Sequence, residues 1–358
     1  MPKLLIAASG TGGHIFPALA VAEALPSSWE VIWLGVPYRL ETKLVSDKYH
    51  LETIRVGGLQ GNKFRKLFLF FQLVLSTLRV WNLIRNEKIN VVFTTGGYIA
   101  APTILSSFIL GVPILLHESN AEPGRVTKLL GRFCRIVAIG FSSASSKLKE
   151  CKTTFTGTPV RNSFFSSLQL PNWVPKYDGP LIVIIGGSQG AIGLNKMVRY
   201  ITPQLLDLGC RIVHLTGDNE LDYQKISHPN YVERAFVNDI PALLQNADLA
   251  ISRAGAGAIS ELAICGTPAI LVPYPQAKDH HQDVNAFSAA STGAAVIVRQ
   301  HEPEDQSLLR VVMHLLKYRL EGKSDKQDQL YLMKSAMKNL AVFNSEKKLI
   351  EIIDQISS

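Results

Sequence analysis

Short apolar runs alternate with longer amphipathic segments along most of the chain. The runs are rich in Val, Ile and Leu, which is typical of strands that are buried on both faces of a parallel sheet. The segments between them have helical spacing, so the pattern predicts strand–helix–strand units and open α/β sheets. Predicted strands lie at residues 3–8, 31–34, 91–94, 114–117 and 136–138, and a second series lies at 181–185, 211–215, 249–251, 269–272 and 295–298.

The two series of strands are separated by residues 156–180, which contain four prolines. Proline ends helices and stiffens a linker, so this segment is predicted to join two domains. A chain of 358 residues is also long for a single core. We therefore expect one α/β domain over residues 1–160 and a second over residues 161–340. A final helix near residues 344–357 can pack on either domain, and the prediction allows it to return to the first.

Each series opens with an apolar strand that runs into a glycine-rich turn. The turns read SGTGGH at residues 9–14 and GGSQG at residues 186–190. Glycine lets the backbone approach a bound group, and the helix that follows directs free N–H groups at an anion. The pair predicts two Rossmann-like domains that bind ligands at the carboxyl ends of their strands and face a central cleft. Taken alone, either turn is equally an ordinary strand-to-helix connection.

The sequence lacks the motifs of several common kinds of site. The first turn has neither the G-x-G-x-x-G spacing of dinucleotide-binding folds nor the lysine of a P-loop. Asp279, His280, His281 and Asp283 have no metal-binding spacing, and the D-x-D motif of metal-dependent glycosyltransferases is missing, so no metal is expected. Four widely spaced cysteines indicate a reducing compartment rather than a disulfide framework.

Polar residues follow several predicted strands, where α/β enzymes place reacting groups. His14 ends the first glycine turn, and its imidazole can accept a proton from a hydroxyl or simply cap the turn. The sequence HESN at residues 117–120 is either a second part of the site or an ordinary loop. In SRAGAGAISE, Glu261 lies one or two turns into a helix, where a carboxylate can accept both hydroxyls of a ribose.

The net charge and one strongly apolar segment indicate which surfaces the protein can bind. The net charge is +8, which favours anionic partners such as nucleic acid, phosphorylated substrates or acidic lipid. Residues 63–88 are strongly apolar on more than one face and have basic ends, but the apolar part is too short to cross a bilayer. This segment predicts contact with an anionic membrane surface, with a strongly apolar core helix as the alternative. The predicted contact residues are Leu67, Phe68, Phe70, Phe71, Leu75, Trp81, Lys63, Arg65 and Lys66.

Six motifs occur in an order that resembles one enzyme family. They are GTGGHIFPALAVAEAL, GGYIAAPTIL, HESN, GTPVRN, GGSQGA and SRAGAGAISELAICGTPAILVPYPQAKDHHQDVNA, and they extend through about residue 300. Together they resemble the MurG family of N-acetylglucosaminyltransferases, in glycosyltransferase family 28. The resemblance implies a GT-B fold and a hexosyltransferase of peptidoglycan synthesis that inverts the anomeric centre. The reaction would move N-acetylglucosamine from UDP-GlcNAc to the 4-hydroxyl of MurNAc on lipid I, giving lipid II.

The resemblance also assigns site residues by motif. It implies that His14 is the general base. It implies donor contacts from Thr11, Gly12, Gly13, Asn120, Arg161, Ser188, Glu261 and Gln282. HESN stands where the family commonly has HEQN, GTPVR where it has GNPVR, and His281 where it has glutamine, so the role of His281 is in doubt.

The resemblance implies a peripheral protein on the cytoplasmic face of the bacterial inner membrane. Its partners would be UDP-N-acetylglucosamine, lipid I and the anionic membrane surface, with no nucleic acid and no cofactor. A related glycosyltransferase that acts on diacylglycerol or another lipid shares these loops and stays an alternative. A UDP-sugar 2-epimerase on the same architecture would need no lipid, so the apolar segment argues against it. A nucleotide-binding module without activity would not need His14.

Overall fold

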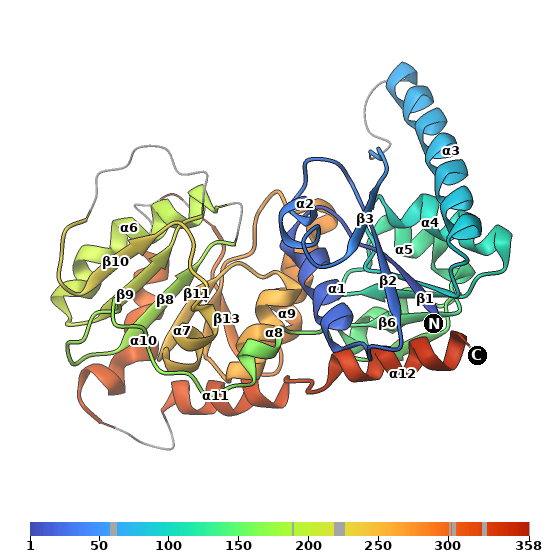
Figure 1. Cartoon of the computed structure of the whole chain (residues 1–358). Helices are drawn as coiled ribbons and strands as arrows, with labels where there is room; N and C mark the ends of the chain where they lie inside the picture. The colour runs from blue at the N-terminus through green and yellow to red at the C-terminus, as the bar shows by residue number, and fades with distance from the viewer. Residues whose placement is uncertain are drawn as a thin grey trace. The chain divides into compact units, whose positions relative to one another are not determined.

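The structure is a computed structural model that describes residues 1–57, 63–187, 190–217, 226–300, 302, 306–323 and 328–357, with only the backbone described for residues 63–68. It divides into two compact units (Figure 1). Unit 1 comprises Met1–Arg161 and Phe343–Ser358, and unit 2 comprises Asn162–Val342. The boundary at Arg161 falls inside the proline-containing segment, and the chain returns to unit 1 at Phe343.

Unit 1 is built on a seven-stranded parallel sheet with the order β3-β2-β1-β4-β5-β6-β7. Its central strand β1 pairs with β2 on one side and β4 on the other, so that Leu5 is opposite both Ile32 and Val92. The strands are β1 (Lys3–Ala7), β2 (Glu30–Gly35), β3 (His50–Thr53), β4 (Val91–Thr94), β5 (Ile114–Glu118), β6 (Ile136–Ile139) and β7 (Thr153–Phe155).

Helices cover both faces of this sheet because alternate residues of each strand point to opposite faces. Leu4 and Ile6 of β1 belong to a core that also contains residues of α1 and α12, and Leu5 and Ala7 belong to a core with residues of α3 and α4. The helices are α1 (Gly12–Ala24), α2 (Glu41–Leu44), α3 (Lys63–Asn86), α4 (Ala100–Leu110), α5 (Arg125–Leu130) and α12 (Ser345–Ser357), with 3-10 turns η1 (Gly131–Phe133) and η2 (Ser142–Lys147).

Unit 2 repeats the plan with six parallel strands in the order β10-β9-β8-β11-β12-β13. The strands are β8 (Leu181–Ile185), β9 (Arg211–Leu215), β10 (Tyr231–Arg234), β11 (Leu249–Ser252), β12 (Ala269–Leu271) and β13 (Ala295–Ile297). The helices are α6 (Ile192–Asp207), α7 (Ile240–Asn246), α8 (Ala256–Cys265), α9 (His281–Ala290), α10 (Ser307–Leu320) and α11 (Gln329–Asn339), with η3 (Asn162–Phe164) and η4 (Lys278–His280).

The predicted fold class, two Rossmann-like α/β domains with parallel sheets, is confirmed. In each sheet the strand order reverses once, between β1 and β4 in unit 1 and between β8 and β11 in unit 2. Ligands of open α/β sheets bind outside the carboxyl ends of the strands at such a switch point. We therefore expect the site of each unit to lie at the loops after these four strands.

The predicted strands are all present, but β3, β7 and β10 were not predicted. All three lie at the edge of a sheet. Among the described residues, none of the helices combines the length and apolar character needed to cross a bilayer.

Candidate active site

The first glycine turn places His14 at the switch point of unit 1. Gly10 has φ +105°, a backbone conformation that residues other than glycine rarely adopt. Thr11 then occupies the N-cap position of α1. His14 is the third residue of α1, and its Nδ1 lies 2.7 Å from the backbone oxygen of Thr95, directly after β4. The Thr95 hydroxyl donates back to the backbone oxygen of His14 at 3.0 Å. Two reciprocal bonds thus join the loops after β1 and β4.

This arrangement selects one tautomer of His14. A carbonyl oxygen can only accept, so Nδ1 carries the proton and the neutral ring keeps its Nε2 lone pair. Gly96 and Gly97, both with positive φ, pass beside the imidazole, and a Cβ on Gly97 would lie 3.7 Å from Nε2. The imidazole is half-buried. A histidine held in this way is suited to take a proton from a hydroxyl at Nε2.

Glu118 organises the HESN turn at the end of β5. Its carboxylate is 5% exposed and accepts from the backbone N–H of Asn120 at 3.1 Å and of Gly124 at 2.9 Å. The Thr127 hydroxyl donates to it at 2.7 Å, and the Asn120 side-chain amide donates to it at 3.2 Å. The buried carboxylate therefore fixes the position of Asn120 at the carboxyl end of β5.

His117, in the same turn, is structural. It is fully buried, and its Nε2 donates to the backbone oxygen of Gly157 at 3.0 Å while Nδ1 accepts from the Ser119 hydroxyl at 3.2 Å. Burial lowers the pKa of His117, so the ring stays neutral. This bond anchors the segment that carries GTPVR.

Arg161 ends that segment in contact with α1. Its guanidinium carbon lies 4.9 Å from the centre of the Phe16 ring, within the distance of a cation–π interaction. Gly12 allows this ring position, because a Cβ there would come 2.7 Å from Phe16 Cε2. Gly12, Phe16 and Arg161 therefore lie together at the first two turns of α1, and Thr11 and Gly13 are exposed.

The second glycine turn lies at the switch point of unit 2. Gly187 and Gly190 have positive φ, and the Gly190 N–H donates to the backbone oxygen of Gly187 at 3.0 Å. Gly217, after β9, passes so close that a Cβ there would lie 2.3 Å from Gly190. The turn leads into the N-terminus of α6. The predicted contact Ser188 lies outside the described residues.

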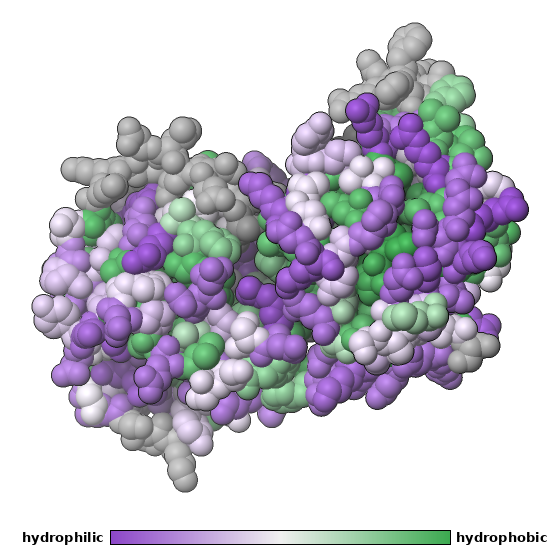
Figure 2. Space-filling view, viewed as in Figure 1, coloured by the Kyte–Doolittle hydropathy of each residue, from purple (hydrophilic) through white to green (hydrophobic). Residues whose placement is uncertain are grey.

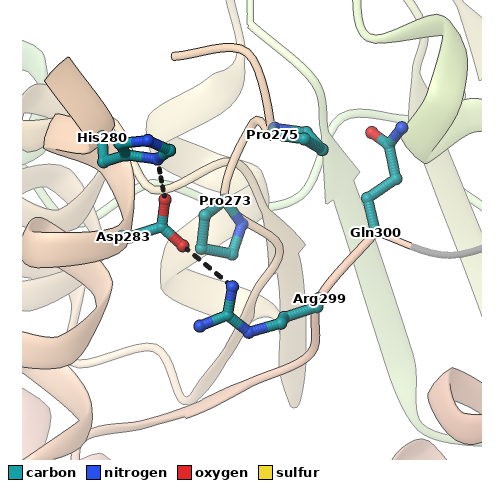
Figure 3. A pocket seen from close by; sticks show the side chains of 6 residues that line it. All are labelled: Pro273, Pro275, His280, Asp283, Arg299 and Gln300. Atoms are coloured by element: carbon teal, nitrogen blue, oxygen red, sulfur yellow. Dashed lines mark ion pairs between the residues drawn. The ribbon is translucent and has the colours of Figure 1, made fainter. Parts of the chain in front are cut away.

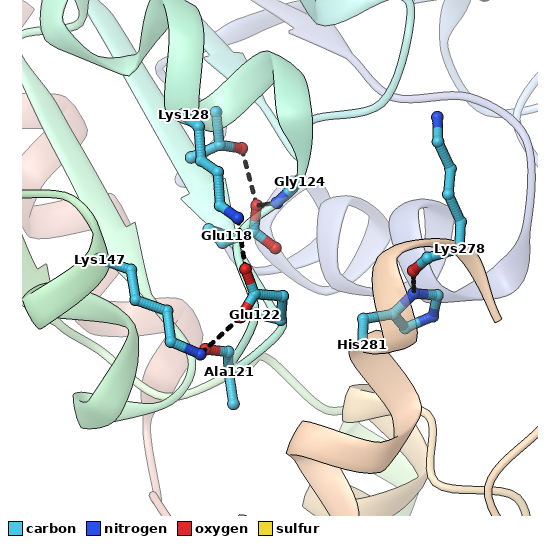
Figure 4. Close-up of polar contacts among 9 residues, drawn as sticks. Glu118, Ala121, Glu122, Gly124, Lys128, Lys147, Lys278 and His281 are labelled. Atoms are coloured by element: carbon cyan, nitrogen blue, oxygen red, sulfur yellow. Dashed lines mark hydrogen bonds and ion pairs between the residues drawn. The ribbon is translucent and has the colours of Figure 1, made fainter.

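Two further predicted donor contacts lie after β11 and β12. Glu261 is half-buried in the second turn of α8. Gln282, in the first turn of α9, accepts from the Tyr274 N–H at 2.9 Å, which ties it to the loop after β12. His281 Nδ1 donates to the Lys278 backbone oxygen at 2.6 Å, which fixes the orientation of the ring (Figure 4).

Asp283, in the first turn of α9, lies near two basic side chains. Asp283 lies 3.5 Å from His280 Nδ1 and 3.7 Å from Arg299 (Figure 3). In the portion of the chain that the structure describes, no three His, Cys, Asp or Glu side chains are grouped to hold a metal ion.

Sequence reasoning missed three residues of these sites. Thr95 and Glu118 orient predicted residues, and Arg253 is a buried arginine directly after β11. Each of these residues ends or follows a strand that lies at a switch point or next to one. Their positions could have been noticed in the sequence, but the residues that they contact could not.

Comparison with known proteins decides the family. The N-terminal domain of glycosyltransferase family 28 matches residues 4–139, and its C-terminal domain matches residues 181–341. The chain belongs to glycosyltransferase family 28. The two matches correspond to the two sheets, one family domain for each unit.

Relatives of this family 28 chain match it along its whole length. A protein of Prochlorococcus marinus (strain MIT 9303) is 58% identical over 353 residues, 99% of this chain and 98% of its own. A protein of Synechococcus sp. (strain CC9311) is 55% identical, with 99% of each chain covered. Both are named UDP-N-acetylglucosamine–N-acetylmuramyl-(pentapeptide) pyrophosphoryl-undecaprenol N-acetylglucosamine transferase. The crystal structure of Acinetobacter baumannii MurG matches with a TM-score of 0.77 at 29% identity, covering 99% of this chain and 100% of that one.

The family 28 chain also carries an exposed apolar stripe on α3. Phe70, Phe71 and Leu75 are 53%, 57% and 60% exposed, whereas Val80 and Ile84, on the opposite face, are buried in the core. Figure 2 shows hydrophobic side chains along the described part of this helix. Trp81 is half-buried, with Arg85 stacked 4.7 Å from its ring centre. The side chains of the predicted contacts Lys63, Arg65, Lys66, Leu67 and Phe68 lie outside the described residues.

Proposed function

We propose that this protein transfers N-acetylglucosamine from UDP-GlcNAc to the 4-hydroxyl of MurNAc in undecaprenyl-diphosphate-MurNAc-pentapeptide (lipid I), giving lipid II. The observation that carries the proposal is the full-length match, at 58% identity, to a relative named for this reaction. The geometry of His14 supports the same chemistry, because a sugar hydroxyl must lose a proton as it attacks.

In this mechanism unit 1 activates the acceptor. The Nε2 atom of His14 takes the proton of the 4-hydroxyl, and the Thr95 carbonyl stabilises the resulting imidazolium through Nδ1–H. Asn120, held by Glu118, is a sugar contact. Thr11, Gly12 and Gly13 supply the backbone of the glycine turn.

Unit 2 holds the donor. Glu261 accepts from the ribose hydroxyls and Gln282 contacts the donor sugar. Ser188 and the N-terminus of α6 bind the diphosphate. Arg161, the last residue of unit 1, is the further donor contact that the GTPVR motif implies. Free N–H groups at a helix N-terminus stabilise the charge that develops on the departing UDP without a metal ion or cofactor. Inversion at the anomeric carbon follows from a single in-line displacement.

We also propose that the protein is peripheral on the cytoplasmic face of the inner membrane, and that α3 meets the bilayer. The acceptor is a lipid, and an exposed apolar stripe with basic residues near both ends of its helix suits an anionic interface. Charge reversal of Lys63, Arg65 and Lys66 should loosen binding to anionic vesicles. Unchanged cosedimentation with vesicles would count against this contact.

The function is tested by incubating the protein with UDP-GlcNAc and a lipid I analogue. UDP release and a product with one added N-acetylglucosamine are expected. Parallel reactions contain diacylglycerol or no acceptor. Transfer to diacylglycerol alone would favour the related glycosyltransferase, and conversion of the donor without acceptor would indicate an epimerase.

A further inference from the structure

Arg253 carries a positive charge into the interior of unit 2. The residue is 7% exposed and directly follows β11. Its Nη1 donates to the backbone oxygens of Val272 at 3.1 Å and Pro273 at 3.3 Å, and its Nη2 donates to Gln300 Oε1 at 2.7 Å. These acceptors are neutral, and no carboxylate among the described residues forms an ion pair with Arg253.

Burial makes such a charge unfavourable. It lowers the pKa of Arg253 to about 10, with the nearby Tyr274 opposing the shift, so the guanidinium still carries its charge at neutral pH. Buried charges in proteins are generally paired, because an unpaired charge has lost its hydration with little in return. The hydrogen bonds to neutral groups and the Tyr274 ring, whose centre lies 5.4 Å from the guanidinium carbon, stabilise the guanidinium in part but supply no full negative charge.

The location of Arg253 indicates which anion compensates it. Its backbone N–H donates to the oxygen of Ile185 at 3.2 Å, and the second glycine turn begins at the next residue. Arg253 therefore lies at the switch point between β8 and β11. The helices that begin there, α6 and α8, have no acidic residue in their first turns. The guanidinium and both helix N-termini therefore contribute positive potential at the same edge of the sheet.

A hollow adjoins the partners of Arg253. Pro273 and Gln300, which both accept from the guanidinium, line a cavity of about 160 Å³ (Figure 3). Gln300 also packs against the start of α6, since a Cβ on Gly193 would lie 2.5 Å from its amide. Through Gln300 the guanidinium is coupled to the helix that follows the glycine turn.

We propose that Arg253 is the buried cation that stabilises the diphosphate of the nucleotide donor and the UDP that leaves. This inference rests on the proposed function. When the bond between the anomeric carbon and the β-phosphate oxygen breaks, its electron pair stays on that oxygen. The acceptor oxygen forms the new bond to the anomeric carbon, and its proton passes to His14. The charge of Arg253 then favours the product diphosphate through the low-dielectric interior.

A purely structural role for Arg253 predicts a different ligand dependence. If the guanidinium only held the loop after β12 and Gln300, removing it would weaken the binding of every ligand of unit 2 alike. If its charge acts on the diphosphate, the loss of affinity should grow with the number of phosphates in the ligand. Dissociation constants for uridine, UMP and UDP, measured by calorimetry on the full chain, separate the two roles.

The variants are Arg253→Met, which removes the charge, and Arg253→Lys, which keeps it. Arg319→Met is the matched control, because Arg319 pairs with Asp248 at the opposite, amino-terminal edge of the same sheet. Arg253→Met should weaken UDP about tenfold or more, since a unit charge at several ångströms contributes that much at an effective dielectric near 20. The affinity for UMP should fall less, and the affinity for uridine should hardly change. Arg253→Lys and Arg319→Met should bind UDP nearly as the parent does.

Equal losses for uridine, UMP and UDP in Arg253→Met, or a loss of UDP in Arg253→Lys as large as in Arg253→Met, would overturn the inference. If Arg253→Met does not fold, the graded loss must appear in Arg253→Gln or the inference fails. A parent protein that binds none of these ligands would instead contradict the proposed function, so the two failures are distinguishable.

Discussion

The proposed role of His14 as a base depends on one carbonyl group. The Thr95 oxygen fixes the proton on Nδ1, and the glycines at positions 96 and 97 leave space beside Nε2. A histidine that merely capped the turn would not need its second nitrogen beside a glycine pair. The sequence left both roles open, and the hydrogen bond to Thr95 is what favours a base.

Replacing His14 by Ala should reduce turnover by roughly 10²–10⁴, the usual contribution of a general base. UDP affinity should stay within about twofold, because the donor is assigned to unit 2. Steady-state kinetics with a lipid I analogue measure the first quantity and calorimetry the second. His50→Ala, at an exposed position on β3, is the control. Near-normal turnover in His14→Ala would remove this residue as the base.

His117 should make folding sensitive to acid. Its pKa is lowered in the folded protein, so below about pH 6.5, the ordinary value, the unfolded chain binds a proton that the folded chain does not. The free energy of unfolding should therefore fall as the pH drops, by up to about 1.4 kcal/mol per pH unit from this residue. Urea titrations from pH 7 to 5.5 should show a smaller fall in the free energy of unfolding for His117→Asn than for the parent protein. An identical slope in both proteins would contradict this account.

At the scale of elements, α3 has one buried and one exposed apolar face. Val80 and Ile84 are buried on one face, and Phe71 and Leu75 are exposed on the other. A helix that only covered a sheet would need one apolar face. The prediction from the sequence rested on this excess of apolar positions, and it remains a prediction about membranes.

The double variant Phe71→Ser/Leu75→Ser should bind anionic vesicles at least about tenfold more weakly, since burying one such side chain is worth roughly 1.5–3 kcal/mol. Vesicle cosedimentation measures the change. Leu332→Ser, on α11 in unit 2 and 56% exposed, removes an equally exposed apolar group and should bind like the parent. Equal binding by the double variant and the parent would exclude this stripe as the contact.

The sheets show why sequence reasoning succeeded in their interiors and failed at three of their four edges, with the apolar edge strand β13 as the exception. β4, β8 and β9 were predicted with the bounds that they have, because inner strands are apolar on both faces. β3 reads HLET and β7 reads TTF, with no buried residue in either. An edge strand has one paired side only and can remain polar, so hydropathy does not reveal it.

Motifs at or after strand ends marked His14, Asn120 and Glu261, and their roles in the site stay predictions. Their supporting contacts were not predictable, because they join distant parts of the chain: Thr95 lies 81 residues from His14. The sequence also did not show that no carboxylate among the described residues pairs with Arg253, since distances between side chains far apart in the chain cannot be read from it.

At the scale of the whole molecule, unit 1 is discontinuous in sequence. The chain returns from unit 2, and α12 packs against α1 (Figure 1). Leu349, Ile350, Ile352 and Ile353 are buried there with Leu4, Ile6 and Ile15. Trp29 also donates to Asp354 at 3.1 Å. The helix is therefore part of the core of unit 1, although unit 2 lies between them in the sequence.

Deleting residues 343–358 should unfold unit 1 and spare unit 2. The four buried side chains are each worth roughly 1.5–3 kcal/mol, together comparable to the roughly 5–15 kcal/mol that holds a domain folded. Limited proteolysis should cut within residues 1–161, while UDP affinity is retained. A protease-resistant unit 1 in the truncated protein would show that α12 is dispensable.

The return of α12 reverses the usual order in which domains mature on the ribosome. Domains generally fold as they emerge, the N-terminal one first. Here the strands of unit 1 emerge first, yet one side of their core stays uncovered until α12 has been translated, after all of unit 2. The nascent chain thus carries an apolar surface through much of its synthesis, where chaperones would bind. His14, the proposed base at the start of α1, therefore reaches its final surroundings only after unit 2 has been translated.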